Sequence, residues 1–350
     1  MDSSLPPARA KTEPATVADV ARLAGVSPAT VSRILNGTAR VAEEKRQAVE
    51  AAIQKLKFRP NLSARGLRSG STHTIGVLTQ ELESPYFASA AKGVDEALTG
   101  SGYAPIVVPG HWNPQEEAER AALLMARKVD ALIVLGGRLT DAQIAELAHQ
   151  QPVAVVGRRV AAPDVFSFFQ DQVEGARLAT QHLIALGHRR IAHIAGPANH
   201  ADAQERKEGF MLAHREAGLT VDPALIVEGD FMEGGGIAAM NALLDAGRGC
   251  TAVFCANDQS LWGAKLALHR RRIAVPAAMS LVGFDDLPQS QYMSPPVTTV
   301  RQHTFEMGQA AAWALLAQLR GAAGRNAPVV PPIALEVRET TAPPGTDVLL

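Results

Sequence analysis

The chain has 350 residues, 47% of them hydrophobic and 20% charged, and a formal net charge of −1. This composition excludes a disordered or fibrous chain, and the length fits two or three domains. The absence of an 18-residue apolar run excludes a transmembrane helix, and the first residues lack the apolar segment of a secretory signal. Two cysteines, Cys250 and Cys255, cannot form a disulfide scaffold, so a cytoplasmic protein is expected.

The net charge conceals an uneven distribution along the chain. Residues 1–72 carry 12 Lys and Arg against 6 Asp and Glu, a net charge of +6, and the remaining residues carry a net charge of −7. This asymmetry indicates a basic segment that meets a polyanion and an acidic body that does not. A solvated basic arm would have the same composition, so the motifs must decide.

Three short helices are predicted in the first sixty residues. Thr16 and Asp19 can form a capping box for a helix that ends at Gly25, and Ser27 can cap a second helix. A third helix is predicted over residues 42–56. Two short helices joined by a glycine-containing turn are typical of a helix-turn-helix, whose second helix enters the major groove of DNA. A small helical bundle is the alternative, but the caps, the turn glycine and the charge together favour DNA binding.

The second helix would present short and polar side chains to DNA. Arg33 can form two hydrogen bonds with guanine O6 and N7, and Pro28 and Ala29 suit a thymine methyl group. Small donors that can hold phosphates and fix the register are Thr16, Ser27, Thr30, Ser32 and Asn36.

Residues 57–72 form a basic connection to the body. Pro60 ends the preceding helix, and Asn61 can cap a following helix that is too short to be stable alone. Leu67 is apolar within this basic segment, so the segment can become ordered on DNA with Leu67 inserted between base pairs in the minor groove. An ordinary interdomain linker is equally compatible with the spacing.

The body alternates strands and helices, which predicts an α/β fold with parallel sheets covered on both faces. The body is longer than a chain segment that usually folds around a single hydrophobic core, so two similar lobes are expected. Strands are predicted at 74–79, 104–108, 131–135, 153–156, 191–195, 225–228, 252–255 and 280–283. Helices are predicted near 85–100, 114–127, 140–149, 173–186, 203–217, 234–246, 258–271 and 304–320.

Ligands of such folds bind at the carboxyl ends of the strands, so the space between the lobes is the expected site. The polar and aromatic side chains that follow these strands suit a sugar or a nucleoside. Capping or packing is an equally good explanation for single residues, such as Asp258 at a helix start. The candidates are Tyr86, Phe87, Gln204, Arg206, Phe231, Asn257 and Asp285.

The sequence predicts no reaction, metal or cofactor. Asp285 and Asp286 are adjacent on one extended segment and point apart, and Cys250 and Cys255 are expected to be buried. The run of glycines at 234–236 lacks the lysine of a nucleotide-binding loop. Two other classes stay open, a periplasmic sugar receptor and a regulator whose partner is a phosphocarrier protein.

Ten segments along the chain form one recognisable set. The N-terminal ones are TVADVARLAGVSPATVSRILNG at 16–37, FRPN at 58–61 and ARGLRSG at 64–70. The others are IGVL at 75–78, SPYF at 84–87, HLIALGHRRIAHIAGP at 182–197, CANDQ at 255–259, VGFDD at 282–286, SPPVTTVRQ at 294–302 and RETTAP at 338–343. Together, in family order over about residues 16–343, they resemble the lactose-repressor (LacI/GalR) family of bacterial transcription regulators.

The resemblance implies a domain organisation and a partner for each part. It implies a tail (1–14), a helix-turn-helix domain (15–60), a hinge helix (61–72), an effector-binding core like a periplasmic sugar-binding protein (73–343) and a C-terminal tail (344–350). It also implies a homodimer on a near-palindromic DNA operator, with a small effector in the core. Arg33 matches the recognition-helix arginine, and Asn61, Ala64 and Leu67 lie in the matching hinge.

The effector positions of the family are matched by Phe87, Phe231, Asn257 and Asp285, but the chain departs from the family elsewhere. Gln204 stands where many members carry an arginine that contacts the effector, and Arg206 is a separate matched position, which leaves the effector class open. Gly66 replaces a frequent serine of the hinge helix, at a cost of about 1 kcal/mol. Ala42 replaces a small hydroxyl residue at the start of the third helix, also at about 1 kcal/mol.

Overall fold

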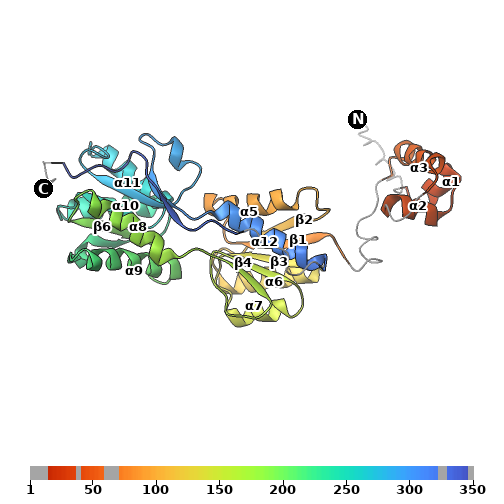
Figure 1. Cartoon of the computed structure of the whole chain (residues 1–350), viewed down its shortest axis with the longest axis horizontal. Coiled ribbons are helices and arrows are strands. Elements are labelled where there is room, and N and C mark those ends of the chain that lie inside the picture. Colours follow the sequence, from red (N-terminus) through yellow and green to blue (C-terminus); the bar gives the residue numbers. More distant parts are fainter. Residues whose placement is uncertain (1–14, 37–40, 59–70, 322–328, 346–350) are drawn as a thin grey trace, which may run out of the picture. The chain divides into compact units, whose positions relative to one another are not determined.

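The computed structural model describes residues 15–36, 41–58, 71–321 and 329–345. These residues fall into two compact units that divide between Thr72 and His73, and Figure 1 shows a small helical unit and a larger α/β unit. Each unit is described by itself. None of the described helices has the length and apolar character needed to cross a membrane.

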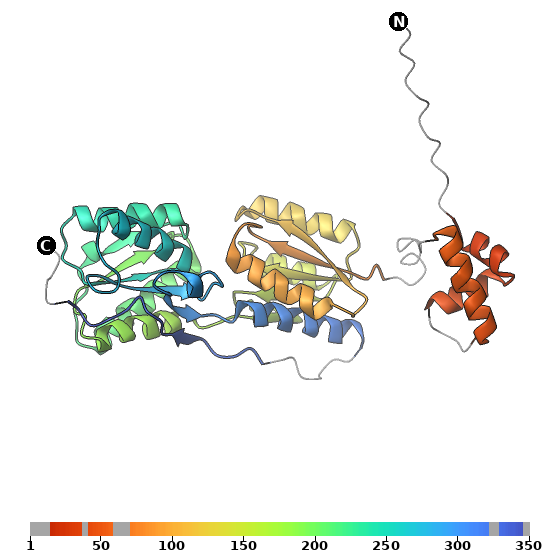
Figure 2. The same cartoon turned by 90° about the horizontal axis from the view of Figure 1, so that it is seen from above.

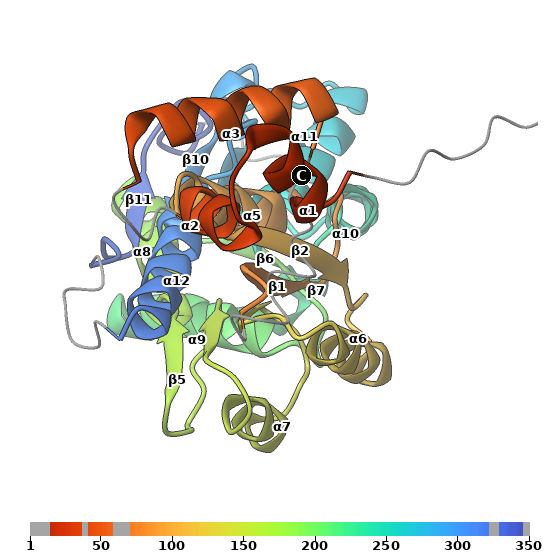
Figure 3. The same cartoon turned by 90° about the vertical axis from the view of Figure 1, so that its right-hand side faces the viewer.

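The first unit is a three-helix domain. It consists of α1 (Val17–Ala24), α2 (Pro28–Asn36) and α3 (Glu43–Leu56), and Figure 3 shows α3 lying across the other two. Its core joins residues from all three helices and from the segment after α3, and consists of Val20, Ala21, Val31, Val49, Ala52 and Phe58.

The predicted caps of the first unit are confirmed. The Thr16 hydroxyl accepts from the backbone N–H of Asp19, whose carboxylate accepts from the backbone N–H of Thr16. Gly25 ends α1 with φ +67°, a conformation that glycine adopts without a steric cost. Ser27 accepts from the backbone N–H of Thr30 at the start of α2. Ala42 caps α3 without a side-chain hydrogen bond.

Lobe 1 of the second unit is a five-stranded parallel sheet with the strand order β2-β1-β3-β4-β5. The strands are β1 (Thr74–Thr79), β2 (Ala104–Pro109), β3 (Ala131–Leu135), β4 (Val153–Val156) and β5 (Val165–Phe168). The helices packed on this sheet are α5 (Pro85–Leu98), α6 (Pro114–Ala126), α7 (Asp141–Ala148) and α12 (Thr304–Leu319).

Lobe 2 is a six-stranded sheet with the order β11-β10-β9-β8-β6-β7. The strands are β6 (Ile191–Ala195), β7 (Ile226–Glu228), β8 (Ala252–Cys255), β9 (Ser280–Asp285), β10 (Thr298–Arg301) and β11 (Ala334–Glu336). The helices are α8 (Gln172–Ala185), α9 (Ala201–Glu216), α10 (Glu233–Asp245) and α11 (Asp258–Arg270), with 3-10 turns at Pro223–Leu225 and Ser290–Tyr292.

The chain returns to lobe 1 late in the sequence, because α12 packs on α5, β4 and β5 (Figures 1 and 2). Glycine permits the close contact between the two helices. A Cβ on Gly93 would lie 2.0 Å from the Phe305 carbonyl oxygen, and one on Gly308 would lie 2.1 Å from that of Ala90. Lobe 1 is therefore built from two separate parts of the chain.

The predicted α/β class is confirmed, and the eight predicted helices of the body lie within two residues of the observed ones. Two details of the prediction are wrong. The sheets are not purely parallel, because β11 pairs antiparallel with β10. Strands β5, β10 and β11 were not predicted: β5 and β11 are short edge strands, and β10 begins with two threonines, which weakens its apolar signal. Cys250 and Cys255 are buried and free, as expected.

Replacing the cap of α1 should destabilise the first unit alone. Thr16→Ala removes one half of the capping box, which costs about 1 kcal/mol. In a domain of this size that loss corresponds to a fall of roughly 4–8 °C in melting temperature. Scanning calorimetry of the full chain measures it. Thr140→Ala, which removes the equivalent capping box of α7, is the matched control and should leave the transition of the first unit unchanged.

Candidate DNA-binding surface and effector site

The exposed surface of the first unit carries the residues predicted to contact DNA. Thr16, Ser27, Pro28, Ala29 and Arg33 are exposed. Among the described residues, none forms an ion pair with the Arg33 guanidinium, which leaves that group available for an anion or a base.

The remaining DNA candidates are less accessible or fall outside the described residues. Thr30 and Ser32 are half-buried, and the Thr30 hydroxyl is 2.9 Å from that of Ser27. The side chain of Asn36 and the residues Asn61, Ala64 and Leu67 lie outside what the structure describes. Their predicted contacts with DNA stay predictions.

In lobe 2 the centre of the candidate effector site is the buried guanidinium of Arg206. Its Nε donates to Gln172 Oε1 at 3.0 Å and its Nη1 to the Ala256 carbonyl oxygen at 2.6 Å. Its Nη2 lies 3.8 Å from the Asp202 carboxylate and 3.7 Å from that of Asp285. These partners come from α8, from α9 and from the ends of β8 and β9.

Two aromatic rings cover this guanidinium. Its central carbon lies 4.0 Å from the centroid of the Phe284 ring and 5.6 Å from that of Phe231. Cation–π attraction adds to the ion pairs because the group is shielded from water. Arg206 is thereby held in one position.

Asp285 is buried at the last position of β9. Its Oδ1 accepts from Gln302 Nε2 at 2.6 Å. Burial raises the pKa of Asp285 to about 6, against the lowering effects of Arg206 and Gln302, and the Asp202 carboxylate adds to the increase. Its φ of +109° is unusual for a residue with a side chain, and such strain concentrates at functional sites.

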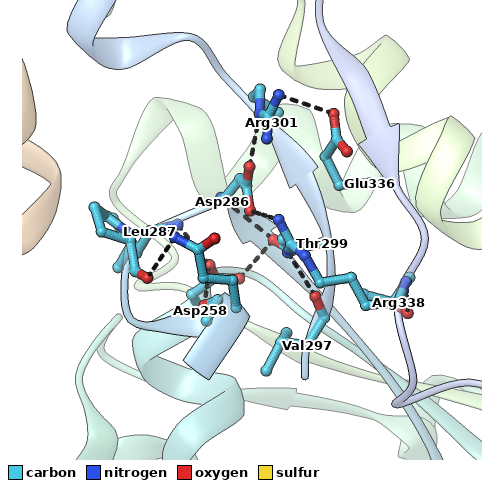
Figure 4. A network of polar contacts seen from close by, with 12 residues as sticks. Asp258, Asp286, Leu287, Val297, Thr299, Arg301, Glu336 and Arg338 are labelled. Carbon is cyan, nitrogen blue, oxygen red and sulfur yellow. Dashed lines mark hydrogen bonds and ion pairs between the residues drawn. The ribbon is translucent and has the colours of Figure 1, made fainter. Parts of the chain in front are cut away.

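The neighbouring Asp286 has other partners and a structural role, because its carboxylate binds Arg301 and Arg338 (Figure 4). Its carboxylate accepts from Arg301 Nε and from Arg338 Nη2, both at 2.6 Å. Arg301 also pairs with Glu336 on β11. The expected divergence of Asp285 and Asp286 is therefore observed, and Asp286 fixes the backbone that carries Asp285.

Asp258 is fully buried beneath this segment. Its carboxylate accepts from the hydroxyls of Ser290 and Thr299, both at 2.6 Å, and from the backbone N–H of Leu287 at 2.9 Å. Burial raises its pKa to about 7, with a further contribution from the charge of Asp285. Because all these contacts are internal, Asp258 positions the loop after β9 and is not available to a ligand.

Phe231 and Asn257 lie together at the same end of lobe 2. Phe231 has φ +67°, and its carbonyl oxygen accepts from Asn257 Nδ2 at 2.8 Å. Asn257 also caps α11 by accepting from the backbone N–H of Ser260. The capping role considered for Asp258 is therefore wrong by one residue, because Asn257 is the cap and holds Phe231 in place as well.

Lobe 1 contributes aromatic side chains. Tyr86 and Phe87 lie in the first turn of α5, with ring centroids 5.2 Å apart, and the Trp112 ring lies 5.7 Å from that of Phe87. The pKa of Tyr86 is raised by burial and then by the carboxylates of Asp202 and Asp285. Tyr86 of lobe 1 therefore lies near the acidic groups of lobe 2.

The structure places Gln204 outside this cluster. Its side chain is exposed on α9, and its Nε2 donates to the Ala198 carbonyl oxygen at 2.6 Å. Arg206, two residues further along the helix, is the residue that enters the cluster.

Sequence reasoning missed six members of the site, Trp112, Gln172, His200, Asp202, Phe284 and Gln302. Trp112 follows the end of β2, so the rule that found Tyr86 after β1 could also have found it. His200 and Asp202 likewise follow β6, whereas Gln172 and Gln302 follow β5 and β10, which were not predicted as strands. Among the described residues, no three His, Cys, Asp or Glu side chains are grouped to hold a metal.

This combination defines a class of protein, a DNA-binding helical domain joined to a two-lobed binding core. The chain belongs to the lacI family of bacterial regulatory proteins. The family model for the regulatory DNA-binding segment matches residues 16–61, and the model for periplasmic binding proteins and the sugar-binding domain of the LacI family matches residues 72–332.

Similar proteins span almost the whole chain. The HTH-type transcriptional regulator GalR of Escherichia coli is 37% identical over 304 residues, which cover 87% of this chain and 89% of GalR. The HTH-type transcriptional repressor PurR of Haemophilus influenzae is 35% identical over 311 residues, which cover 87% of this chain and 91% of PurR. These relatives are named as transcriptional regulators, which agrees with the expectation of a non-enzymatic protein.

Solved structures share the fold. The lac repressor dimer bound to operator and the anti-inducer ONPF has a TM-score of 0.84 and 29% identity, with 94% of this chain and 100% of that chain covered. The complex of the transcriptional regulator CelR with cellobiose has a TM-score of 0.67 and 33% identity, with 93% and 99% covered.

The raised pKa of Asp285 should make stability depend on pH. Its pKa is about 6 in the folded protein and 3.8 ordinarily, so the folded state binds more protons and stability falls as pH rises from about 4 to about 6. Asp285→Asn should remove this part of the fall, on the order of 2–3 kcal/mol. Urea unfolding midpoints at pH 4.5 and 6.5 measure it. The exposed Asp164→Asn is the control, and an unchanged pH dependence in Asp285→Asn would contradict the assignment.

Proposed function

We propose that the chain is a transcriptional repressor that acts in the cytoplasm as a homodimer on a near-palindromic operator. In this proposal residues 15–60 bind DNA, residues 61–72 form the hinge, and residues 73–343 bind the effector and dimerise. The observation that carries the DNA-binding part is the exposed Arg33 on the second helix of a basic segment. A two-fold symmetric dimer would set the spacing of the operator half-sites.

Control by an effector requires two arrangements of the lobes. A ligand changes operator affinity only if it binds one arrangement more tightly than the other. The chain passes between the lobes after β5, between β10 and α12, and between α12 and β11, so a change at the lobe boundary moves three segments together. In this proposal that movement alters the hinge and thereby the spacing of the two DNA-binding domains.

The charges of the site support an uncharged, hydroxyl-rich effector, such as a carbohydrate. Asp202 and Asp285 share the single buried cation of Arg206, which already donates to two neutral acceptors. An additional phosphate or carboxylate would face an excess of negative charge. Sugar hydroxyls, in contrast, can donate to the carboxylates, and the apolar face of a sugar suits the rings of Tyr86 and Phe231.

Replacing Arg33 should change which base pair is preferred. Arg33→Ala should weaken binding to an operator selected from a random duplex library by about 5- to 150-fold, equivalent to about 1–3 kcal/mol, and relax the preference at one position of each half-site. Binding to the selected operator and to its single-base variants measures both effects. Arg22→Ala, an exposed arginine of α1 that pairs with Asp19, is the control and should leave the sequence preference intact. Uniform weakening across all variants would contradict base recognition by Arg33.

A ligand panel tests the nature of the effector. We expect an uncharged sugar to raise the melting temperature of the full chain, and its phosphate ester to raise it less or not at all. In Asp285→Asn the response should disappear while operator binding persists, because Asp285 belongs to the core. Screening monosaccharides, cellobiose and glucose 6-phosphate by thermal shift provides the measurement. A phosphorylated sugar that binds more tightly than its neutral form would refute this ligand class.

A further inference from the structure

A row of aromatic rings crosses from one lobe to the other. Trp112 follows β2 in lobe 1, and His200 precedes α9 in lobe 2. Their ring centroids are 4.7 Å apart, with the rings inclined by 69°. Trp112 also contacts Phe87 of lobe 1, and His200 contacts Phe231 of lobe 2, with a centroid distance of 5.1 Å. The row therefore connects an effector candidate of lobe 1 to one of lobe 2.

A polar contact lies beside this aromatic row. Arg138, in the loop after β3, donates to Asn199 Oδ1 at 3.4 Å. The loop is held from within lobe 1, because the buried carboxylate of Glu117 accepts from the backbone N–H groups of Arg138 and Leu139. The lobe 1 side of this contact is thus anchored in its own lobe.

The imidazole of His200 is held in an environment that suits its neutral form. Its Nδ1 is buried and has no hydrogen-bond partner among the described residues. The charged groups around the ring are Asp202 and Arg206 on α9 and Arg138 of lobe 1. Burial lowers the pKa of His200, Asp202 acts in the opposite sense, and both arginines lower it further.

We propose that Trp112 and His200 form a contact that holds the two lobes together, and that protonation of His200 opens it. The proposal goes beyond the proposed function and does not depend on the identity of the effector. When the rings are in contact, they occupy the surface between Phe87 and Phe231. An effector that uses those two residues must displace the pair, so the contact opposes effector binding.

The direction of the pH effect follows from the location of the ring. In the closed arrangement the ring is covered and its pKa is lowered, whereas in an open arrangement water solvates it and its pKa returns toward about 6.5. The contact is therefore fully formed well above pH 6.5 and weakens as pH falls, because protons bind preferentially to the open arrangement.

Tryptophan fluorescence of the full chain tests the contact without an effector. The variant Trp262→Phe/Trp313→Phe retains Trp112 as its single tryptophan. We expect an emission maximum typical of a shielded indole at pH 8, and a shift to longer wavelength between pH 7 and 5. Adding His200→Gln or His200→Phe should abolish the pH-dependent shift, whereas adding His111→Gln, at an exposed histidine that pairs with Glu116, should leave it intact. A shift that persists in both His200 variants would overturn the proposal.

A distance measurement tests whether the contact holds the lobes. Spin labels at the exposed positions Gln150→Cys in lobe 1 and Ala246→Cys in lobe 2 report the separation, since Cys250 and Cys255 are buried. We expect Trp112→Ala and His200→Ala each to broaden the distance distribution at pH 8. The double variant should match the single variants, because each single variant already removes the whole contact. A distribution identical to that of the parent would overturn the proposal, even if the effector prediction holds.

Discussion

The buried guanidinium of Arg206 is the interaction on which the candidate effector site depends. A buried charge is tolerated only when it is paired and hydrogen-bonded, and removing one partner of such a pair costs about 3–5 kcal/mol. Here the partners are Gln172 on α8, the Ala256 carbonyl after β8, and the carboxylates of Asp202 and Asp285. A single cation therefore fixes four segments of lobe 2 relative to one another, and a ligand meets a surface that is already formed.

Hydrogen bonds and ion pairs within the site also stabilise strained backbone conformations. Trp112, Phe231 and Asp285 all have positive φ, which residues with side chains rarely adopt. For two of them the supporting contacts are clear: Asn257 donates to the Phe231 carbonyl oxygen, and the ion pairs of Asp286 fix the residue after Asp285. Strain of this kind persists only when the surroundings determine the conformation. Asp286 and Asn257 therefore fix the conformation of Asp285 and Phe231.

The sequence predicts the helices of this structure better than its strands and its site residues. Several helices begin at a local signal, such as Thr16 before α1 or Asn113 followed by Pro114 before α6, which helps to predict them closely. Strand β10 was missed because its threonines are buried as partners of Asp258 and Thr341, which no local pattern reveals. The same limit applies to the site: Arg206 and Asp285 follow predicted strands, whereas the contact between His200 and Trp112 is visible only in the fold.

The two lobes offer a ligand different kinds of contact. Lobe 2 provides carboxylates and a guanidinium in a fixed arrangement, whereas lobe 1 provides mainly aromatic surface, and its buried Gln80 and Glu117 are engaged by its own backbone N–H groups. A ligand can thus form directional hydrogen bonds with lobe 2 while it gains only apolar contact from lobe 1. The apolar contact of lobe 1 becomes available only when a ligand displaces the Trp112–His200 pair, so the ligand and the pair favour different arrangements of the lobes. Because the two lobes bind a ligand through different kinds of contact, binding to lobe 2 would change the position of lobe 1.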